Sequence, residues 1–377
     1  MAQNGTELEN DILPFKRFDV VSNDSDHYYA KRKNKAKKND VVSAGGGGAA
    51  VVATGEDNHD DDSSSMNDCA SATVSQVHKK IMKEWRILER NLPDSIYVRV
   101  YENRIDLLRA VIVGAAGTPY HDGLYFFDLA FPSDYPARPP KVHYRSYGLR
   151  LNPNLYANGT VCLSLLNTWS GKTTERWNPA ESTVLQVLVS IQALVLNERP
   201  YFNEPGTGLF GQARWEKYSR DYNRDVFLLC CKTTIHSIRN PPKHFEEFVA
   251  AHYRERAKVF LGACRAYANG RVRIGYYRDG DENDVVSEEI YVSKKFVGTM
   301  KLIYYQLVTS FLKVGATGIG GHQLKLVKKT TSFELESNGK NQKKKAFVEK
   351  LVTTIKRVFR LVNKKSGKNS NNNAISV

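Results

Sequence analysis

Apolar and basic residues alternate with helical spacing around residue 80. The apolar side chains are Val77, Ile81, Trp85 and Leu88. The basic side chains between them are Lys79, Lys80, Lys83 and Arg86. Because this spacing places the two kinds of residue on opposite faces, it predicts an amphipathic helix. The basic face is either a solvated surface or a contact for a partner.

Four short runs rich in β-branched and aromatic residues follow this helix. They cover residues 96–101, 107–113, 124–131 and 141–144, and clusters of Gly, Pro and Asp separate them. Such runs are typical of strands joined by turns. One helix followed by neighbouring strands and then by further helices predicts an α+β fold with an antiparallel sheet.

The second half of the chain carries the patterns of longer helices. Residues 183–196 are strongly apolar but too few to span a bilayer, which predicts a central core helix. Residues 214–238, 242–264 and 297–314 predict three more helices. Residues 346–362 place apolar and basic side chains on opposite faces. They predict a helix that either lies on a membrane or partner or is docked on its own domain.

The N-terminal arm has little core-forming pattern. Residues 14–21 form an apolar and aromatic island, which we interpret as a short peptide lying on the domain or on a partner. Residues 31–38 are a basic block of the nuclear-import type, and residues 39–71 have the composition of a disordered segment. We therefore predict a largely disordered arm (1–73), a core domain (74–265) and a basic, partly helical extension (266–377).

Charge and cysteine content restrict the class of protein. The 377 residues carry a formal net charge of +15, which favours an acidic protein, an anionic membrane surface or nucleic acid as partner, unless the basic tails are merely solvated. The five cysteines fit neither paired zinc ligands nor a small disulfide scaffold, so we expect a reducing compartment. We find no segment resembling a signal peptide and no run of 18 apolar residues.

The candidate chemistry lies in residues 151–177. An Asn-Pro-Asn turn at 152–154 and an Asn-Gly turn signal at 158–159 precede Cys162. The second turn returns the chain, so Asn154 can lie near the cysteine. A thiolate nucleophile beside an amide that donates to an oxyanion suits acyl transfer. Taken alone, a lone cysteine is more often a small buried apolar residue than a nucleophile.

With its surroundings, this stretch resembles the ubiquitin-conjugating enzyme family. The spacing from Asn154 to Cys162 matches that of the family, and the resemblance covers residues 74–265. It implies the ubiquitin-conjugating (UBC) fold, with a four-stranded antiparallel sheet flanked by helices. The Asn-Pro-Asn version resembles a large plant subgroup related to hybrid conjugating/ligase enzymes and to the giant apoptosis-inhibitor type. Further residues that carry the resemblance are Pro119, Tyr120, Gly123, Phe131, Pro132, Tyr135, Pro136, Pro139, Pro140, Pro153, Gly159, Trp177 and Pro179.

The resemblance implies a catalytic set of Cys162, Asn154 and Asn152. Cys162 would accept ubiquitin as a thioester and pass it to a substrate lysine or a ligase cysteine, and a partly exposed thiol would supply thiolate near neutral pH. Asn154 either donates to the oxyanion or braces the loop over the cysteine. Asn152 stands where most members have histidine, and it shapes the loop. The environment of the substrate lysine is expected at Tyr201, Asn203 and Glu204.

The resemblance also implies partner surfaces. The exposed face of the first helix would receive the activating enzyme through Lys79, Lys80 and Lys83. Two loops would dock ligases through Pro136, Ala137 and Ala180. Ala137 replaces the bulky aromatic of many members, which argues against ordinary ligase binding because large buried rings supply much of an interface's energy. The inserted loop 167–172 carries Trp169, which either packs locally or contacts the thioester or substrate.

The resemblance implies no bound cofactor, because ATP is used by the activating enzyme and the chain has no Gly-rich phosphate loop. The expected partners are ubiquitin, the activating enzyme, protein substrates and a ligase. A membrane surface or nucleic acid could bind the basic tails but is not expected as the main partner. The expected location is the cytoplasm or nucleus. The rival hypothesis is a non-catalytic ubiquitin-binding adaptor on the same fold, which the retained cysteine argues against. A nucleic-acid binder would rest on charge alone.

Overall fold

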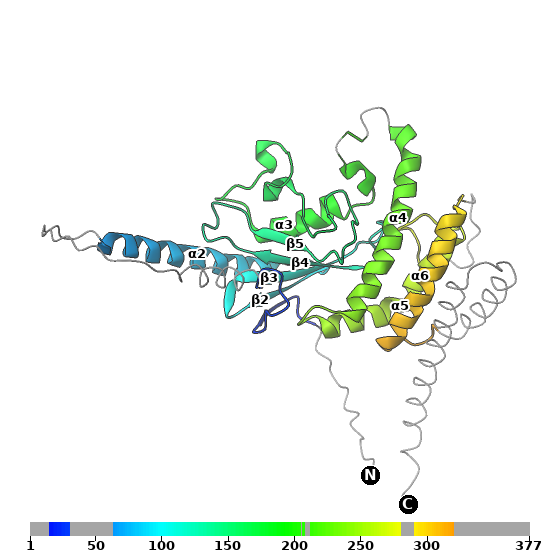
Figure 1. Cartoon of the computed structure of the whole chain (residues 1–377), viewed down its shortest axis with the longest axis horizontal. Coiled ribbons are helices and arrows are strands. Elements are labelled where there is room, and N and C mark those ends of the chain that lie inside the picture. The colour runs from blue at the N-terminus through cyan, green and yellow to red at the C-terminus, as the bar shows by residue number, and fades with distance from the viewer. Residues whose placement is uncertain (1–14, 31–62, 205, 208–211, 280–289, 320–377) are drawn as a thin grey trace, which may run out of the picture. The chain divides into compact units, whose positions relative to one another are not determined.

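The computed structural model describes residues 15–30, 63–204, 206–207, 212–279 and 290–319 (Figure 1). The strands are β1 (Phe18–Val21), β2 (Ile96–Tyr101), β3 (Arg104–Val113), β4 (Leu124–Ala130) and β5 (Lys141–Tyr144). The α-helices are α2 (Ser63–Asn91), α3 (Val184–Ser190), α4 (Gln212–Arg239), α5 (Glu246–Ala268) and α6 (Lys294–Lys313). Single turns are η1 (Ser164–Leu166), η2 (Thr173–Glu175), the π-helical η3 (Ile191–Val195) and η4 (Pro200–Asn203). The four predicted strands are therefore confirmed, and the second begins earlier than expected.

The elements fall into two compact units that alternate along the chain. The first unit combines residues 1–112, 126–142 and 164–189, and the second combines residues 113–125, 143–163 and 190–377. Helix α2 and the Pro-rich loop belong to the first unit, whereas Cys162 and helices α4 to α6 belong to the second. The expected boundaries at residues 73 and 265 stay a prediction.

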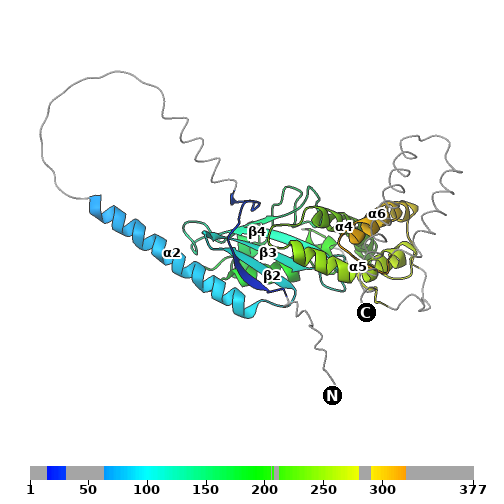
Figure 2. The ribbon, with the colours of Figure 1, turned by 90° about the horizontal axis from the view of Figure 1, so that it is seen from below.

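The sheet corrects the expected strand number and direction. Its order is β1-β2-β3-β4-β5, and β2 pairs with β3 antiparallel, with Val98 opposite Ala110. Strand β1 pairs with β2 in parallel, with Phe18 opposite Val98 (Figure 2). The sheet is therefore mixed and five-stranded rather than antiparallel and four-stranded. Four residues carry too little periodicity to reveal a strand, and the unpaired edge of β2 supplies the hydrogen bonds that make β1 one.

The N-terminal segment, residues 15–30, is held on the rest of the first unit by residues that follow β1. Arg109 is fully buried, and it bonds Asp128 through Nε at 2.6 Å and Asp26 through Nη1 at 2.8 Å. The backbone N–H of Tyr28 donates to Asp128 Oδ2 at 2.8 Å, and His27 Nε2 lies 3.0 Å from the Leu108 carbonyl oxygen. The expected short peptide lying on the domain is thus observed for residues 15–21. The order continues to residue 30, within the arm expected to be largely disordered, because a buried arginine needs partners that this segment supplies.

Helix α2 buries the apolar face that its spacing predicts. Ile81 and Leu88 are 2% and 0% exposed. The helix begins at Ser63 rather than near residue 74. One buried residue on this face is acidic: Glu84 accepts from the Tyr135 hydroxyl at 2.7 Å and from the Val184 N–H at 2.9 Å. Because Val184 opens α3, the carboxylate satisfies a helix N-terminus and joins three segments of the first unit.

Helices α4, α5 and α6 pack together in the second unit (Figure 1). Phe311 of α6 makes ring contacts with Tyr253 and Phe260 of α5. The predicted helix over residues 297–314 is confirmed, and it packs on the two helices that precede it. The expected single helix over 183–196 changes from α-helix to π-helix at Ile191. Cys230, Cys231 and Cys264 are buried, as expected.

Several expectations lie outside the described residues: the basic block 31–38, most of the disordered segment 39–71, the helix 346–362 and the tail 366–377. Within the described part of the chain, every helix is too short or too polar to cross a membrane.

Candidate active site

Two consecutive turns bring Cys162 back beside the Asn-Pro-Asn turn, all within the second unit. The N–H of Leu155 donates to the carbonyl of Asn152 at 3.0 Å, and the N–H of Gly159 donates to the carbonyl of Tyr156 at 2.9 Å. Gly159 has a φ of 89°, and an added Cβ there would lie 2.0 Å from the His143 ring. Only glycine therefore fits this turn without displacing the neighbouring ring.

Asn154 and Cys162 are joined by two hydrogen bonds. The Cys162 N–H donates to the Asn154 carbonyl at 2.9 Å, and Asn154 Nδ2 donates to the Cys162 carbonyl at 3.0 Å. The expected proximity of the two residues is thus observed. In this arrangement the amide braces the main chain at the cysteine, which is one of the two roles considered for Asn154. The second hydrogen on Nδ2 is not used by this bond, so the geometry leaves the oxyanion role open.

The thiol of Cys162 is more enclosed than the sequence suggested. The residue is 7% exposed, and burial raises the pKa of the thiol above its usual value. Two neighbours oppose this rise: the Tyr156 side chain hydrogen-bonds the sulfur, and Arg150 adds a positive charge. The Arg150 guanidinium lies 4.7 Å from the centre of the Tyr156 ring. The expected partly exposed thiol is therefore corrected to a buried thiol with two groups that favour its thiolate.

Sequence reasoning missed Tyr156 and Arg150. Both lie within a few residues of the Asn-Pro-Asn turn, and a hydroxyl and a cation so close to a candidate nucleophile could have been flagged on that ground. Spacing alone could not show that the second turn directs Tyr156 toward the sulfur.

Asn152 shapes the site through buried hydrogen bonds. Its side chain is fully buried, and Nδ2 donates to the Tyr120 hydroxyl at 2.8 Å and to the Val195 carbonyl at 2.7 Å. Its Oδ1 accepts from the Asn154 N–H at 2.8 Å. These contacts are those of a residue that shapes the loop, and the place of Asn152 in the catalytic set stays a prediction.

The three residues expected around the substrate lysine have different surroundings. Asn203 donates to the Val195 carbonyl at 3.2 Å and accepts from Asn197 Nδ2 at 2.7 Å, so its amide braces the loop. Tyr201 makes ring contacts with Phe202 of the same loop and with Trp215 and Tyr222 of α4. Glu204 is exposed, and its Oε2 lies 3.7 Å from Arg150 Nη2. Of the three, Glu204 is the carboxylate connected through Arg150 to the surroundings of Cys162.

The expected partner residues all lie in the first unit. Lys79, Lys80, Lys83, Ala137 and Ala180 are exposed, and Pro136 is half-buried. Trp177 Nε1 donates to the Pro136 carbonyl at 2.7 Å, which ties the Pro-rich loop to the segment before Ala180. These positions are accessible to a partner, and their binding roles stay predictions.

The inserted loop also lies in the first unit. Trp169 is half-buried and lines a shallow hollow together with Trp177. An added Cβ at Gly171 would lie 2.3 Å from Ser164 Oγ, so the loop is folded tightly against η1. This packing supports a local role for Trp169. Contact with a thioester or substrate stays a prediction.

Metal binding has no support in the described residues, where no group of three or more His, Cys, Asp or Glu side chains could hold an ion. The expectation that no cofactor is bound is untested by the structure.

Comparison with known proteins gives the family. A family profile described as "Ubiquitin-conjugating enzyme" matches residues 80–227. "Putative ubiquitin-conjugating enzyme E2 38" of Arabidopsis thaliana is 50% identical over 71% of this chain and 80% of its own length. "Probable ubiquitin-conjugating enzyme E2 26" of Arabidopsis thaliana is 43% identical over 91% of this chain and 56% of its own length.

A human relative supports the resemblance to the giant apoptosis-inhibitor type. "Dual E2 ubiquitin-conjugating enzyme/E3 ubiquitin-protein ligase BIRC6" of Homo sapiens is 39% identical over 53% of this chain but only 4% of its own length. The chain thus spans about half of one plant relative and a small part of the human one. The expected resemblance to the plant subgroup and to this hybrid type is confirmed. The chain belongs to the ubiquitin-conjugating enzyme family.

Proposed function

We propose that this protein is an active ubiquitin-conjugating enzyme whose nucleophile is Cys162. The observation that carries the proposal is the double hydrogen bond between Cys162 and Asn154, in a turn where Tyr156 and Arg150 both favour the thiolate. A buried thiol without such neighbours would be a packing residue. A thiol with a hydrogen-bond donor and a cation beside it can act as a nucleophile.

The first step is transthiolation. The Cys162 thiolate attacks the thioester carbonyl that joins ubiquitin to the activating enzyme, a new C–S bond forms, and the cysteine of the activating enzyme leaves as a thiolate. ATP is consumed at the activating enzyme, so this chain requires no cofactor of its own.

The second step transfers ubiquitin to an amine or to another thiol. A neutral lysine amine attacks the carbonyl, the Cys162 thiolate leaves, and the amine loses a proton as the amide forms. Glu204 is the carboxylate of this site that could take that proton, because it is exposed and adjacent to Arg150. Where a ligase has its own cysteine, transfer to that thiol replaces this step.

The proposed partners are ubiquitin, its activating enzyme, a ligase and protein substrates, in the cytoplasm or nucleus. The net charge of +15 supports an additional acidic partner, including a membrane surface or nucleic acid. Lys79, Lys80 and Lys83 supply an exposed basic strip on α2 for the activating enzyme.

The test is a charging assay with the full chain, activating enzyme, ATP and ubiquitin. We expect a band one ubiquitin heavier that reducing agent removes. Cys162→Ala should lack it, Cys162→Ser should lack it or give a reductant-stable ester, and Cys69→Ser should retain it. A chain that remains uncharged with ubiquitin and with related modifiers would contradict the proposal and favour the adaptor.

A further inference from the structure

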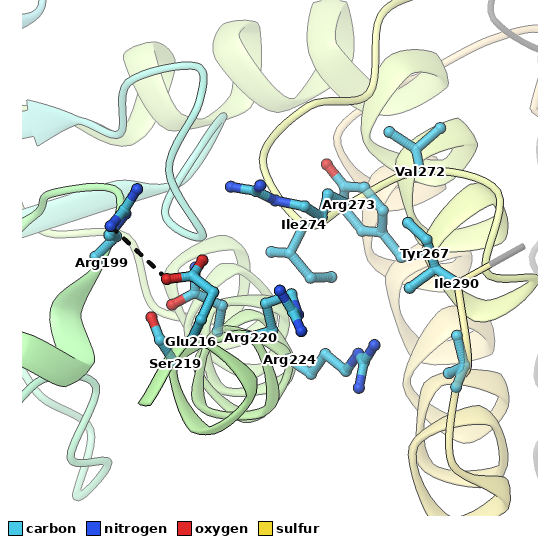
Figure 3. Close-up of a pocket in the computed structure, with 12 residues that line it drawn as sticks. Arg199, Glu216, Ser219, Arg220, Arg224, Tyr267, Val272, Arg273, Ile274 and Ile290 are labelled. Atoms are coloured by element: carbon cyan, nitrogen blue, oxygen red, sulfur yellow. Dashed lines mark ion pairs between the residues drawn. The ribbon is translucent and has the colours of Figure 1, made fainter. Parts of the chain in front are cut away.

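A basic groove lies in the second unit between α4, residues 271–276 and the start of α6. Its volume is about 1060 Å³. Figure 3 shows an adjoining pocket that shares Arg220, Arg224 and Arg273 with this groove, where side chains of α4 face Arg273 and Ile274. Arg224 Nη2 donates to the Tyr291 carbonyl at 2.8 Å, which holds the segment before α6 against α4 and forms one wall.

Positive charge dominates the lining. Its cationic side chains are Lys217, Arg220, Arg224, Arg271, Arg273 and Lys295, against the two carboxylates Asp221 and Asp225. Arg224 pairs with Asp221 at 2.5 Å, so part of the charge is neutralised locally. Lys217 and Arg220 are exposed, and among the described residues no carboxylate pairs with either. These two side chains are therefore available to an acidic ligand.

The groove also has an apolar floor. Leu228 and Phe296 lie beneath it, 8% and 4% exposed. Tyr276 and Tyr291 stand at its edge, 45% and 81% exposed. A polypeptide that alternates acidic and apolar side chains suits such a mixed surface. A continuous phosphate backbone suits it less, because it carries charge at every unit and has no apolar side chains to cover Leu228 and Phe296.

One wall of the groove is bonded to the loop that braces the active site. Tyr276 Oη donates to Glu198 Oε1 at 2.5 Å, and Arg273 Nη2 lies 3.1 Å from the same oxygen. The next residues of that loop reach the catalytic turn, since Asn203 donates to the Val195 carbonyl that also accepts from Asn152. A polypeptide in the groove would thus lie against the same loop that carries Glu204.

We propose that this groove binds an acidic segment of the protein to be modified and so directs a neighbouring lysine to Cys162. The proposal rests on the proposed conjugating function and adds a substrate class to it: proteins with a lysine near a stretch of Asp or Glu interspersed with apolar residues. Arginine forks bind carboxylates with two parallel hydrogen bonds, which gives such a site its chemical preference.

The test separates binding from chemistry. Binding is measured by fluorescence anisotropy on the full-length Cys162→Ser chain, with a labelled peptide of alternating Glu and Leu that ends in one lysine. The comparison peptide has Gln in place of Glu. Transfer is measured as single-turnover discharge of the charged wild-type chain onto the same peptides, with spacers of several lengths before the lysine.

We expect the Glu peptide to bind and react about fivefold to tenfold better than the Gln peptide, which is the effect of a few exposed ion pairs. The preference should weaken as salt is raised. Lys217→Glu combined with Arg220→Glu should abolish it, while Lys232→Glu, an exposed lysine farther along α4, should preserve it. If the charge reversal impairs folding, Lys217→Gln combined with Arg220→Gln replaces it. For that variant the ratio of Glu-peptide to Gln-peptide binding should be nearly one.

Three outcomes would overturn the groove assignment. The first is equal binding of the Glu peptide by wild type and by the double variant. The second is binding of single-stranded RNA in preference to the peptide. The third is that the peptide binds only after the acidic residues between α5 and α6 are replaced by neutral ones. That result would mean that this stretch of the same chain occupies the groove. The residues to replace are Asp281, Glu282, Asp284, Glu288 and Glu289. Failure of charging with intact peptide binding would instead refute the proposed function alone.

Discussion

The side-chain amide of Asn154 donates to the main-chain carbonyl of Cys162 over 3.0 Å. Its own Oδ1 is buried and has no partner among the described residues, so this bond orients the amide. The asparagine therefore holds the backbone on which the nucleophile is carried. Its first contribution is to place the sulfur.

Replacement of this amide should affect stability as well as rate. We expect Asn154→Ala to lower the free energy of unfolding by about 1 kcal/mol, the usual net value of one hydrogen bond, and to slow charging and discharge by about tenfold or less. Urea unfolding and single-turnover discharge measure the two effects. A discharge rate reduced about a hundredfold with unchanged stability would instead show that the amide acts mainly on the oxyanion.

Tyr156 should control the pH dependence of charging. Burial raises the pKa of Cys162, and the Tyr156 hydrogen bond and the Arg150 charge lower it. Below that pKa the thiolate fraction rises about tenfold per pH unit. Tyr156→Phe removes one group that favours the thiolate, so the charging rate should fall near pH 7 and its rise should move to higher pH. Tyr218→Phe, an exposed tyrosine on α4, should leave the profile unchanged, and an unshifted profile for Tyr156→Phe would contradict the role.

Glu204 should matter for amine acceptors and not for charging. We expect Glu204→Gln to slow discharge onto free lysine by about a hundredfold, the lower end of the range for a positioned proton acceptor. Raising the pH should reduce the difference in discharge rate between Glu204→Gln and wild type, because more of the lysine is then already neutral. The charging rate should be unchanged, and Glu247→Gln at the start of α5 should behave as wild type. If the variant discharges more slowly than wild type by the same factor at every pH, Glu204 has a structural role and does not accept the proton.

The fold was predictable where periodicity extends over enough residues. The spacing from Val77 to Leu88 identifies α2, and the four apolar runs identify β2 to β5. Strand β1 could not be found in this way, because four residues at a sheet edge owe their conformation to the partner strand. Glu84 was equally hidden: its burial follows from the Val184 N–H and the Tyr135 hydroxyl, neither of which is near it in the sequence.

The sequence predicts which residues of the site come together, but not the contacts that their side chains make. Turn residues on both sides of residue 156 require the chain to return, which places Asn154 beside Cys162. The choice between Asn203 and Glu204 depends on side-chain direction, which spacing does not give. The structure directs the Asn203 amide to the Val195 carbonyl and leaves the Glu204 carboxylate exposed beside Arg150.

His27 should make attachment of the N-terminal segment sensitive to acid. Burial lowers its pKa, although Asp128 nearby acts in the opposite direction. The unfolded chain takes up a proton on this residue near pH 6.5, and the folded chain does so only at lower pH. Protons thus favour the unfolded form, so stability is complete above about pH 6.5 and declines as the pH falls below it, by at most about 1.4 kcal/mol per unit. The pKa of Asp128, which faces His27, is lowered, so its own titration lies below this window.

Urea unfolding at several pH values between 5.5 and 7.5 measures this decline. His252 in the second unit also has a pKa lowered by burial, so the contribution of His27 is read from the difference between wild type and His27→Gln. We expect the variant to be less stable at pH 7.5, because it disturbs the contact with the Leu108 carbonyl, and to lose less stability on acidification. His78→Gln, on the exposed face of α2, should follow wild type. Parallel curves for wild type and His27→Gln would show that the imidazole anchors the segment through packing alone, independently of its protonation.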